Sequence, residues 1–260
     1  MKSERLAARN VACFCAISWS IAGPSTLCGD DHSELTMKRP GPRVLWPILP
    51  IAALLLLFAA IAWTVFEADS GALDRAAILT LRNMADRMGP EWVQDSARNV
   101  TSLGSVIVVC ILAGAYTGYL LLSGQRRSAI LMLISVIGGL VLNDLLKAIF
   151  DRPRPDLALP SVQVFTSSFP SGHAALSSVA YLSMGSLFAR DTPSAIVKAY
   201  VMATAILLVF LIGMSRVYLG VHYPTDVLAG WCIGSAWALT CWLVAEEGEK
   251  RPYENDRQRK

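Results

Sequence analysis

The sequence predicts an all-α, polytopic membrane protein with six transmembrane helices and both termini in the cytoplasm. Apolar residues make up 54% of its 260 residues and charged residues 17%, whereas a soluble domain carries about 25% charged residues. The apolar residues are also gathered into six stretches of roughly the 20 residues that a helix needs to cross a bilayer. Basic residues fall in alternate links between these stretches, and this asymmetry predicts the orientation.

The six predicted spans are residues 44–66, 103–123, 129–150, 172–189, 195–214 and 226–245. The fourth is short and contains several small residues, among them Ser177, Ser178 and Gly185. Small residues let helix backbones approach closely. We therefore expect the fourth span to pack against other helices instead of facing lipid.

Basic residues in the links indicate which side is the cytoplasm. They are Lys38, Arg39, Arg43, Arg126, Arg127, Arg190 and Lys198, together with those of the C-terminal tail. All fall on one side of a six-span protein, which the positive-inside rule assigns to the cytoplasm. The opposite side receives residues 67–101, 151–171 and 215–225.

By composition the chain divides into three parts. Residues 1–43 form an N-terminal leader, in which an apolar run at 11–22 is too short to span and follows Arg5 and Arg9, as in a signal peptide. We expect that Met37 is the true start, or that the leader is removed or disordered. Residues 44–245 form a six-helix transmembrane domain, and residues 246–260 form a charged cytoplasmic tail.

The first outer segment carries a helical pattern. Ile78, Leu81, Ala85 and Met88 recur at helical spacing, and a Gly-Pro pair at 89–90 ends it. The pattern fits a soluble helix that caps the protein, and it equally fits an amphipathic helix in the membrane interface. The sequence leaves both interpretations open.

Composition argues against several classes of partner. The net charge of +3 comes from basic residues at segment ends, so we expect no nucleic-acid partner. The six cysteines form no CxxC pair, and no His/Cys group has zinc-ligand spacing. We therefore expect neither a disulfide framework nor a metal site.

Three clusters of polar residues lie at the predicted outer face. In the first, Lys147 and Arg154 are seven residues apart, and Arg152 and Arg154 alternate with two prolines that should end the helix. Snorkelling to lipid headgroups is the ordinary explanation for single cations, but it does not account for two arginines braced by prolines. Asp144 and Asp151 could pair with Lys147.

The second cluster, Ser171-Gly172-His173, opens the fourth span. Serine at a helix start is ordinary capping, but the backbone N–H groups of a helix N-terminus can also hold an anion. Gly172 would allow a close approach of that anion to the backbone. His173 could then protonate a leaving oxygen.

The third cluster places Arg216 before His222 and Asp226, which are four residues apart. If helical geometry extends back through the intervening turn, the two side chains share a face. A carboxylate that holds one imidazole nitrogen leaves the other free to attack. Alternatively, Asp226 caps the sixth span and His222 is merely interfacial.

Together the clusters resemble the type-2 phosphatidic acid phosphatase superfamily, which includes membrane lipid phosphatases and soluble vanadium haloperoxidases. The shared pattern is Lys147-x6-Arg154-Pro155, Pro170-Ser171-Gly172-His173 and Ser215-Arg216-x5-His222-x3-Asp226. The resemblance covers roughly residues 44–245. The six predicted spans indicate the membrane branch, similar to bacterial phosphatidylglycerophosphatase B and undecaprenyl-diphosphatase. They argue against haloperoxidase activity, because the haloperoxidases are soluble.

The resemblance implies a role for each motif residue. His222 attacks phosphorus and forms a phosphohistidine, Asp226 orients it, and His173 protonates the leaving group and then activates water. The residues that bind the phosphate oxygens are Lys147, Arg154, Ser171, Gly172 and Arg216. Arg152 stands outside the pattern and receives no role.

The resemblance thus implies a metal-independent phosphatase without a cofactor, acting on a phospholipid or isoprenoid lipid such as phosphatidic acid, phosphatidylglycerol phosphate or undecaprenyl diphosphate. We expect it in a bacterial inner membrane with its site at the periplasmic face. A phosphotransferase that passes the phosphoryl group to another lipid or a sugar is the alternative enzyme. A transporter is the non-enzymatic alternative, although the ionisable residues gather at one face instead of marking a path across the midplane. The sequence specifies neither the lipid nor the oligomeric state.

Overall fold

The computed structural model describes residues 42–67, 71–87, 90–157 and 166–258, and within these ranges the regular structure is entirely α-helical. The all-α prediction is therefore confirmed. The helices are α1 (Pro42–Phe66), α2 (Gly71–Arg87), α3 (Pro90–Ser102), α4 (Val106–Leu122), α5 (Arg126–Phe150), α6 (Gly172–Asp191), α7 (Ala195–Tyr218) and α8 (Pro224–Gln258). The predictions for the leader before Pro42 lie outside the described residues.

Six of these helices, α1 and α4 to α8, correspond to the predicted spans. Among the described residues, α1, α5, α7 and α8 are long and apolar enough to cross a membrane. Helices α3 and α4 form a pair bent by 50°, which would make a fifth crossing. Helix α8 is longer than predicted, because it continues through the charged tail to Gln258. Six crossings and the orientation stay predictions.

Helix α6 lies at the centre of the bundle and contacts α4, α5, α7 and α8. Its serines at 177 and 178 are fully buried, so the expected packing of this segment against other helices is confirmed. Two glycines of α8 allow the backbone of α8 to approach that of α6 closely. A Cβ atom on Gly230 would lie 2.7 Å from the carbonyl oxygen of Ser171, and one on Gly234 would clash with that of Ala175.

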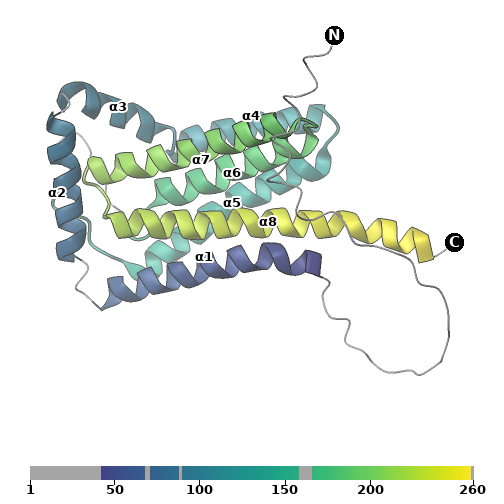
Figure 1. Ribbon diagram of the computed structural model, residues 1–260, viewed down its shortest axis with the longest axis horizontal. Helices are drawn as coiled ribbons and strands as arrows, with labels where there is room; N and C mark the ends of the chain where they lie inside the picture. Colours follow the sequence, from purple (N-terminus) through teal and green to yellow (C-terminus); the bar gives the residue numbers. More distant parts are fainter. Residues whose placement is uncertain (1–41, 68–70, 88–89, 158–165, 259–260) are drawn as a thin grey trace, which may run out of the picture. The chain divides into compact units, whose positions relative to one another are not determined.

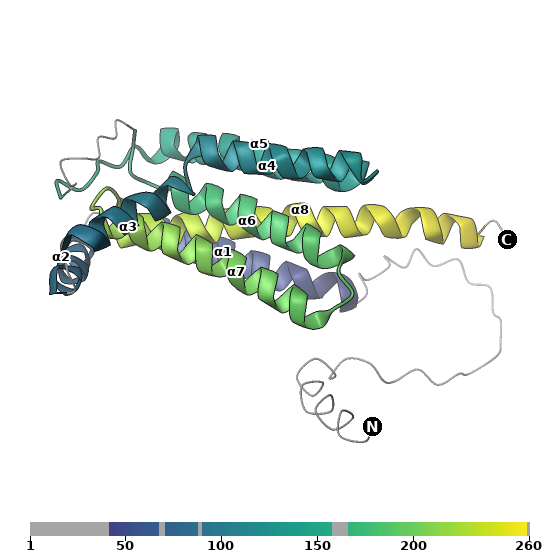
Figure 2. The same cartoon turned by 90° about the horizontal axis from the view of Figure 1, so that it is seen from above.

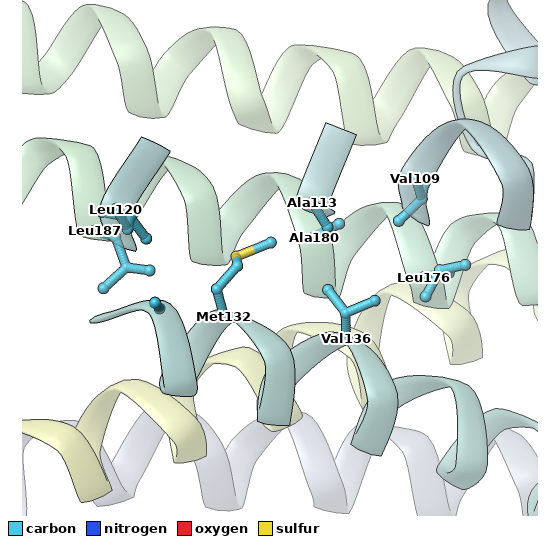
Figure 3. Packing of buried hydrophobic residues seen from close by; sticks show 9 residues of the cluster. Val109, Ala113, Leu120, Met132, Val136, Leu176, Ala180 and Leu187 are labelled. Carbon is cyan, nitrogen blue, oxygen red and sulfur yellow. The ribbon is translucent and has the colours of Figure 1, made fainter. Parts of the chain in front are cut away.

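A hydrophobic cluster holds α4 and α5 against α6 (Figure 3). Each helix supplies residues spaced by about one turn, such as Met132 and Val136 of α5 and Leu176 and Ala180 of α6. All four are buried. This packing fixes where the end of α5 lies relative to the start of α6, and both ends carry predicted site residues.

Helix α2 lies across one end of the bundle, where α7 ends and α8 begins (Figures 1 and 2). Ile78 of α2 has no exposed surface and packs against Ala174, Val217 and Val227. This packing favours the capping interpretation of α2 over a helix lying free in the interface. Helix α2 ends at Arg87, before the predicted stop, of which Gly89 lies outside the described residues. Pro90 begins α3, as proline commonly does at the first position of a helix.

Candidate active site

The three clusters converge at the end of the bundle covered by α2. Consecutive helices from α5 to α8 pack against one another, so the ends of α5 and α7 lie near the starts of α6 and α8. The α6–α7 and α7–α8 links are short, whereas the link between α5 and α6, residues 151–171, is longer. From these four ends and their loops come Lys147, Arg154, Ser171, Gly172, His173, Arg216, His222 and Asp226. Residues that are up to 79 positions apart in the chain are thereby brought to one place.

His222 and Asp226 form a buried pair, with 1% and 0% of their surfaces exposed. Helix α8 begins at Pro224, so His222 lies in the preceding turn, whereas a helix running back to His222 was one premise of the sequence prediction. The turn still places imidazole Nδ1 3.5 Å from Asp226 Oδ2. This separation is long for a hydrogen bond, as catalytic contacts often are before a substrate binds. Nε2 points the other way and lies 3.2 Å from Arg154 Nη1.

Asp226 also caps α8. Its Oδ2 accepts a hydrogen bond from the Tyr223 backbone N–H at 2.9 Å, and the Ser168 hydroxyl donates to the same oxygen. Arg152 Nη1 donates to Oδ1 at 2.5 Å. The capping interpretation and the interpretation as a partner of His222 therefore both hold for this carboxylate.

Arg154 is held by the backbone on two sides of the site. Its Nη1 donates to the Val221 carbonyl at 2.8 Å, and its Nε donates to the Thr166 carbonyl at 2.6 Å. Lys147 Nζ donates to the Thr166 hydroxyl at 3.2 Å. The loop after α5 thus positions Arg154 beside His222 Nε2, and its Thr166 contacts both Arg154 and Lys147.

Among the described residues, Lys147 makes no direct ion pair with Asp144 or Asp151, although Asp144 interacts with it electrostatically. Asp144 instead accepts a hydrogen bond from the Asn143 amide. Asp151 ends α5 in the left-handed region, with φ of 34° and its N–H bonded to the Lys147 carbonyl. The chain turns there, and the returning loop brings Thr166 to the lysine ammonium.

Several buried polar atoms at this end have no hydrogen-bond partner among the described residues. They are Arg216 Nε, Ser171 Oγ and Asn143 Oδ1. Arg216 is only 4% exposed, and its Nη1 donates to the Thr101 hydroxyl at 3.2 Å. Buried donors are rarely left unsatisfied, and a bound oxyanion would satisfy both Arg216 Nε and Ser171 Oγ. A Cβ on Gly172 would lie 3.2 Å from Asn143 Nδ2, so a larger residue would crowd this place.

The electrostatics of the site favour an anion. His173 interacts electrostatically with Arg216, His222, Lys147 and Arg154, so the two imidazoles and three cations share one field. Burial lowers the pKa of His222 to about 4; the contact with Asp226 opposes this shift, and Arg216 and Arg154 reinforce it. Burial also lowers the pKa of the Arg154 guanidinium. A neutral imidazole surrounded by fixed cations is suited to attack a phosphate.

Three residues at the site were not predicted from sequence: Ser168, Arg152 and Asp74. Arg152 Nη2 lies 3.0 Å from Asp74 Oδ2 of α2, and the other terminal nitrogen contacts Asp226. Snorkelling is therefore the wrong interpretation for Arg152, which pairs with carboxylates inside the protein. The proline-flanked arginine was a visible signal, but nothing in the local pattern pointed to Asp74.

Within the described ranges, no three His, Cys, Asp or Glu side chains gather closely enough to hold a metal ion. Cys110, Cys232 and Cys241 are free thiols, and the last two are buried in α8. A buried free thiol of this kind packs as a small apolar side chain.

Comparison with known proteins decides the family. The sequence model of the PAP2 superfamily matches residues 128–249, which include all three clusters. Phosphatidylglycerophosphatase B of Bacillus subtilis (strain 168) is 31% identical over 210 residues, covering 78% of this chain and 95% of the relative. The chain belongs to the PAP2 superfamily.

A second relative is similar in sequence, and a solved structure is similar in fold. Lipid A 1-phosphatase of Rhizobium etli is 31% identical over 205 residues, covering 71% of this chain and 79% of the relative. The crystal structure of the first transmembrane PAP2-type phosphatidylglycerolphosphate phosphatase from Bacillus subtilis matches with a TM-score of 0.68 and 27% identity, covering 76% of this chain and 96% of that one. This PAP2 chain is accordingly a multi-pass membrane protein and a phosphatase of the lipid phosphatase family.

Proposed function

We propose that this PAP2 phosphatase hydrolyses the terminal phosphate of a phospholipid or isoprenoid lipid through a phosphohistidine on His222, without a metal. One observation carries the proposal. His222 directs Nδ1 to the buried carboxylate of Asp226 and Nε2 to the guanidinium of Arg154. The imidazole is thus arranged as a nucleophile whose target would be bound by a cation.

In the first step, His222 Nε2 attacks phosphorus as the bond to the lipid oxygen breaks, and His173 gives its proton to that leaving oxygen. Negative charge on the three remaining oxygens requires fixed donors. The proposed donors are Lys147, Arg154, Arg216, the Ser171 hydroxyl and the Gly172 N–H. The orphaned Arg216 Nε and Ser171 Oγ support this set.

In the second step, His173 takes a proton from water, and the hydroxide attacks phosphorus as the bond to His222 Nε2 breaks. Inorganic phosphate leaves, and both histidines return to their initial states. Asp226 keeps the Nδ1 proton in place and stabilises the imidazolium character that develops on His222.

The lipid class is supported by the two relatives above, which act on phosphatidylglycerophosphate and on lipid A by their names. We propose that residues 44–245 form a six-span catalytic domain in a bacterial inner membrane, with both termini and the 246–260 tail in the cytoplasm. The site would then open at the periplasmic face. The hydrocarbon chains of the substrate would stay in the bilayer beside the exposed apolar faces of the helices.

Phosphate release from four lipids in mild detergent with EDTA tests the proposal. The lipids are phosphatidic acid, phosphatidylglycerol phosphate, undecaprenyl diphosphate and diacylglycerol diphosphate. We expect the wild type to release inorganic phosphate and His222→Ala to release none above background, with its thermal melting retained. Loss of a covalent nucleophile is severe: in a serine protease it costs on the order of 10⁶-fold in kcat. Strict dependence on a divalent ion would contradict the metal-free mechanism. A phosphorylated acceptor in place of inorganic phosphate would indicate the phosphotransferase.

A further inference from the structure

A buried chain of charges joins α2 to the reacting pair. Asp74 of α2 is 4% exposed, and its Oδ2 lies 3.0 Å from Arg152 Nη2. Arg152 Nη1 lies 2.5 Å from Oδ1 of the fully buried Asp226. Both terminal nitrogens of one guanidinium are therefore engaged by carboxylates, one from the capping helix and one from the reacting pair.

Neighbouring groups hold this chain in place. The Thr225 hydroxyl donates to Asp74 Oδ2 at 2.6 Å, and its backbone N–H donates to Oδ1 at 3.3 Å. The Arg152 guanidinium stacks over the Tyr223 ring, 4.2 Å from its centroid. The Arg152 carbonyl accepts the Ser168 N–H at 2.8 Å. Buried charged groups with such complete partners have one arrangement, since breaking a buried pair is strongly unfavourable.

These contacts fix the orientation of the Asp226 carboxylate. Arg152 occupies Oδ1, while Oδ2 receives the Ser168 hydroxyl and the Tyr223 N–H and faces His222 Nδ1. Without the guanidinium, the carboxylate would lose the contact that keeps its two oxygens distinct. The planar fork of arginine is suited to hold a carboxylate in this way.

We propose that Arg152 and Asp74 are positioning residues, which set the carboxylate of Asp226 toward His222 and tie its placement to the docking of α2. The inference rests on the proposed function, in which His222 is the nucleophile. Arg152 directs its terminal nitrogens at carboxylates, so it acts through Asp226 and not as a phosphate ligand.

The test measures kcat and KM separately with p-nitrophenyl phosphate and with phosphatidic acid. Arg152→Gln is expected to lower kcat roughly 100-fold on both substrates, the loss that follows when a reacting group is displaced by about 1 Å. KM should change less than about twofold, since phosphate binding is untouched. Arg152→Lys should recover part of the loss, because one ammonium restores the charge but cannot span both carboxylates.

Arg82→Gln is the matched control. Arg82 also fastens α2 to the end of the bundle, but it does so through the carbonyls of Leu157 and Tyr218. Its loss should lower the melting temperature and leave kcat per folded enzyme unchanged. A general loosening of α2 is thereby separated from a displaced carboxylate.

A double-mutant cycle supplies the second readout. Asp74→Asn keeps an amide oxygen that can still accept a hydrogen bond from Thr225. It should lower kcat in the wild-type background and have little further effect in Arg152→Gln, because the proposed route from Asp74 to Asp226 runs through the arginine. Full kcat in folded Arg152→Gln, a change confined to KM, or additive effects in the cycle would overturn the inference while leaving the proposed function intact. Should Arg152→Gln fail to fold, Arg152→Lys and Asp74→Asn carry the same comparison. An inactive wild type would instead overturn the proposed function, and this inference with it.

Discussion

At the scale of the residue, Asp226 shows how one side chain serves structure and chemistry together. Its Oδ2 receives the Tyr223 N–H at the start of α8 and also faces His222 Nδ1. A carboxylate has about four lone-pair positions, so helix capping does not compete with orientation of the imidazole. The two interpretations that the sequence left open are compatible for this reason.

The lowered pKa of His222 predicts how stability depends on pH. The folded protein holds the imidazole neutral down to about pH 4, whereas an unfolded histidine binds a proton below about pH 6.5. Between these values the unfolded state binds more protons, so stability should fall as the pH falls. Thermal melting between pH 4 and 7 checks this, with His222→Gln as the control whose melting temperature depends less on pH. The titration of His222 can also be measured by nuclear magnetic resonance of labelled histidines. A His222 ring that titrates near pH 6.5 would contradict the prediction.

At the scale of the element, the contact between α6 and α8 depends on glycine. A Cβ on Gly234 would clash with the Ala175 carbonyl and lie 2.8 Å from Ser178 Cβ. Backbone atoms cannot move aside as a flexible side chain can. The helix that carries His173 and the helix that carries Asp226 are therefore held at a separation that a methyl group would increase.

Gly234→Ala should accordingly destabilise the protein by about 1–3 kcal/mol, the usual penalty for overpacking. Gly118→Ala in α4 is the matched control, because nothing lies within 4 Å of its added Cβ. That variant should be neutral or stabilised by roughly 0.5–1 kcal/mol, since alanine favours a helix over glycine. Melting temperatures of the two variants in the same detergent provide the measurement, and equal shifts would argue against the close approach.

The bend between α3 and α4 is an element that the sequence did not predict. The second span was expected to begin at 103, but α4 begins at Val106 after a break. The break presents the Leu103 carbonyl to the Tyr181 hydroxyl at 2.8 Å, and a Cβ on Gly104 would lie 2.5 Å from Ile212 Cγ2. Contacts with α6 and α7 therefore accompany the change of direction, and such contacts are invisible in a hydropathy pattern.

At the scale of the whole molecule, the six-span topology makes a labelling prediction. In a variant without native cysteines, Ser123→Cys lies between α4 and α5 and should react with an impermeant maleimide only after the membrane is opened. Asn83→Cys on α2 is exposed and should react in intact cells or outer-membrane-permeabilised cells. Both positions reacting from the same side would overturn the proposed orientation of the site.

Much of this protein was determined by its sequence alone. The helical class and the positions of most helices follow from hydropathy, because the length of an apolar stretch reflects the thickness of a bilayer. The motif residues from Lys147 to Asp226 were also found from sequence, and the structure brings them together at one end. These features are local, in that each motif is read from residues within about a dozen positions.

Only the tertiary structure decided which groups the motif residues contact. Lys147 bonds Thr166 of a returning loop instead of the aspartates near it in sequence. Asp74 lies 78 positions from Arg152, yet the two meet because α2 lies across the end where α8 begins. Pairings of this kind depend on how helices dock, and docking is set by packing that sums over many distant residues. The spacing of residues within a motif therefore does not predict these pairings.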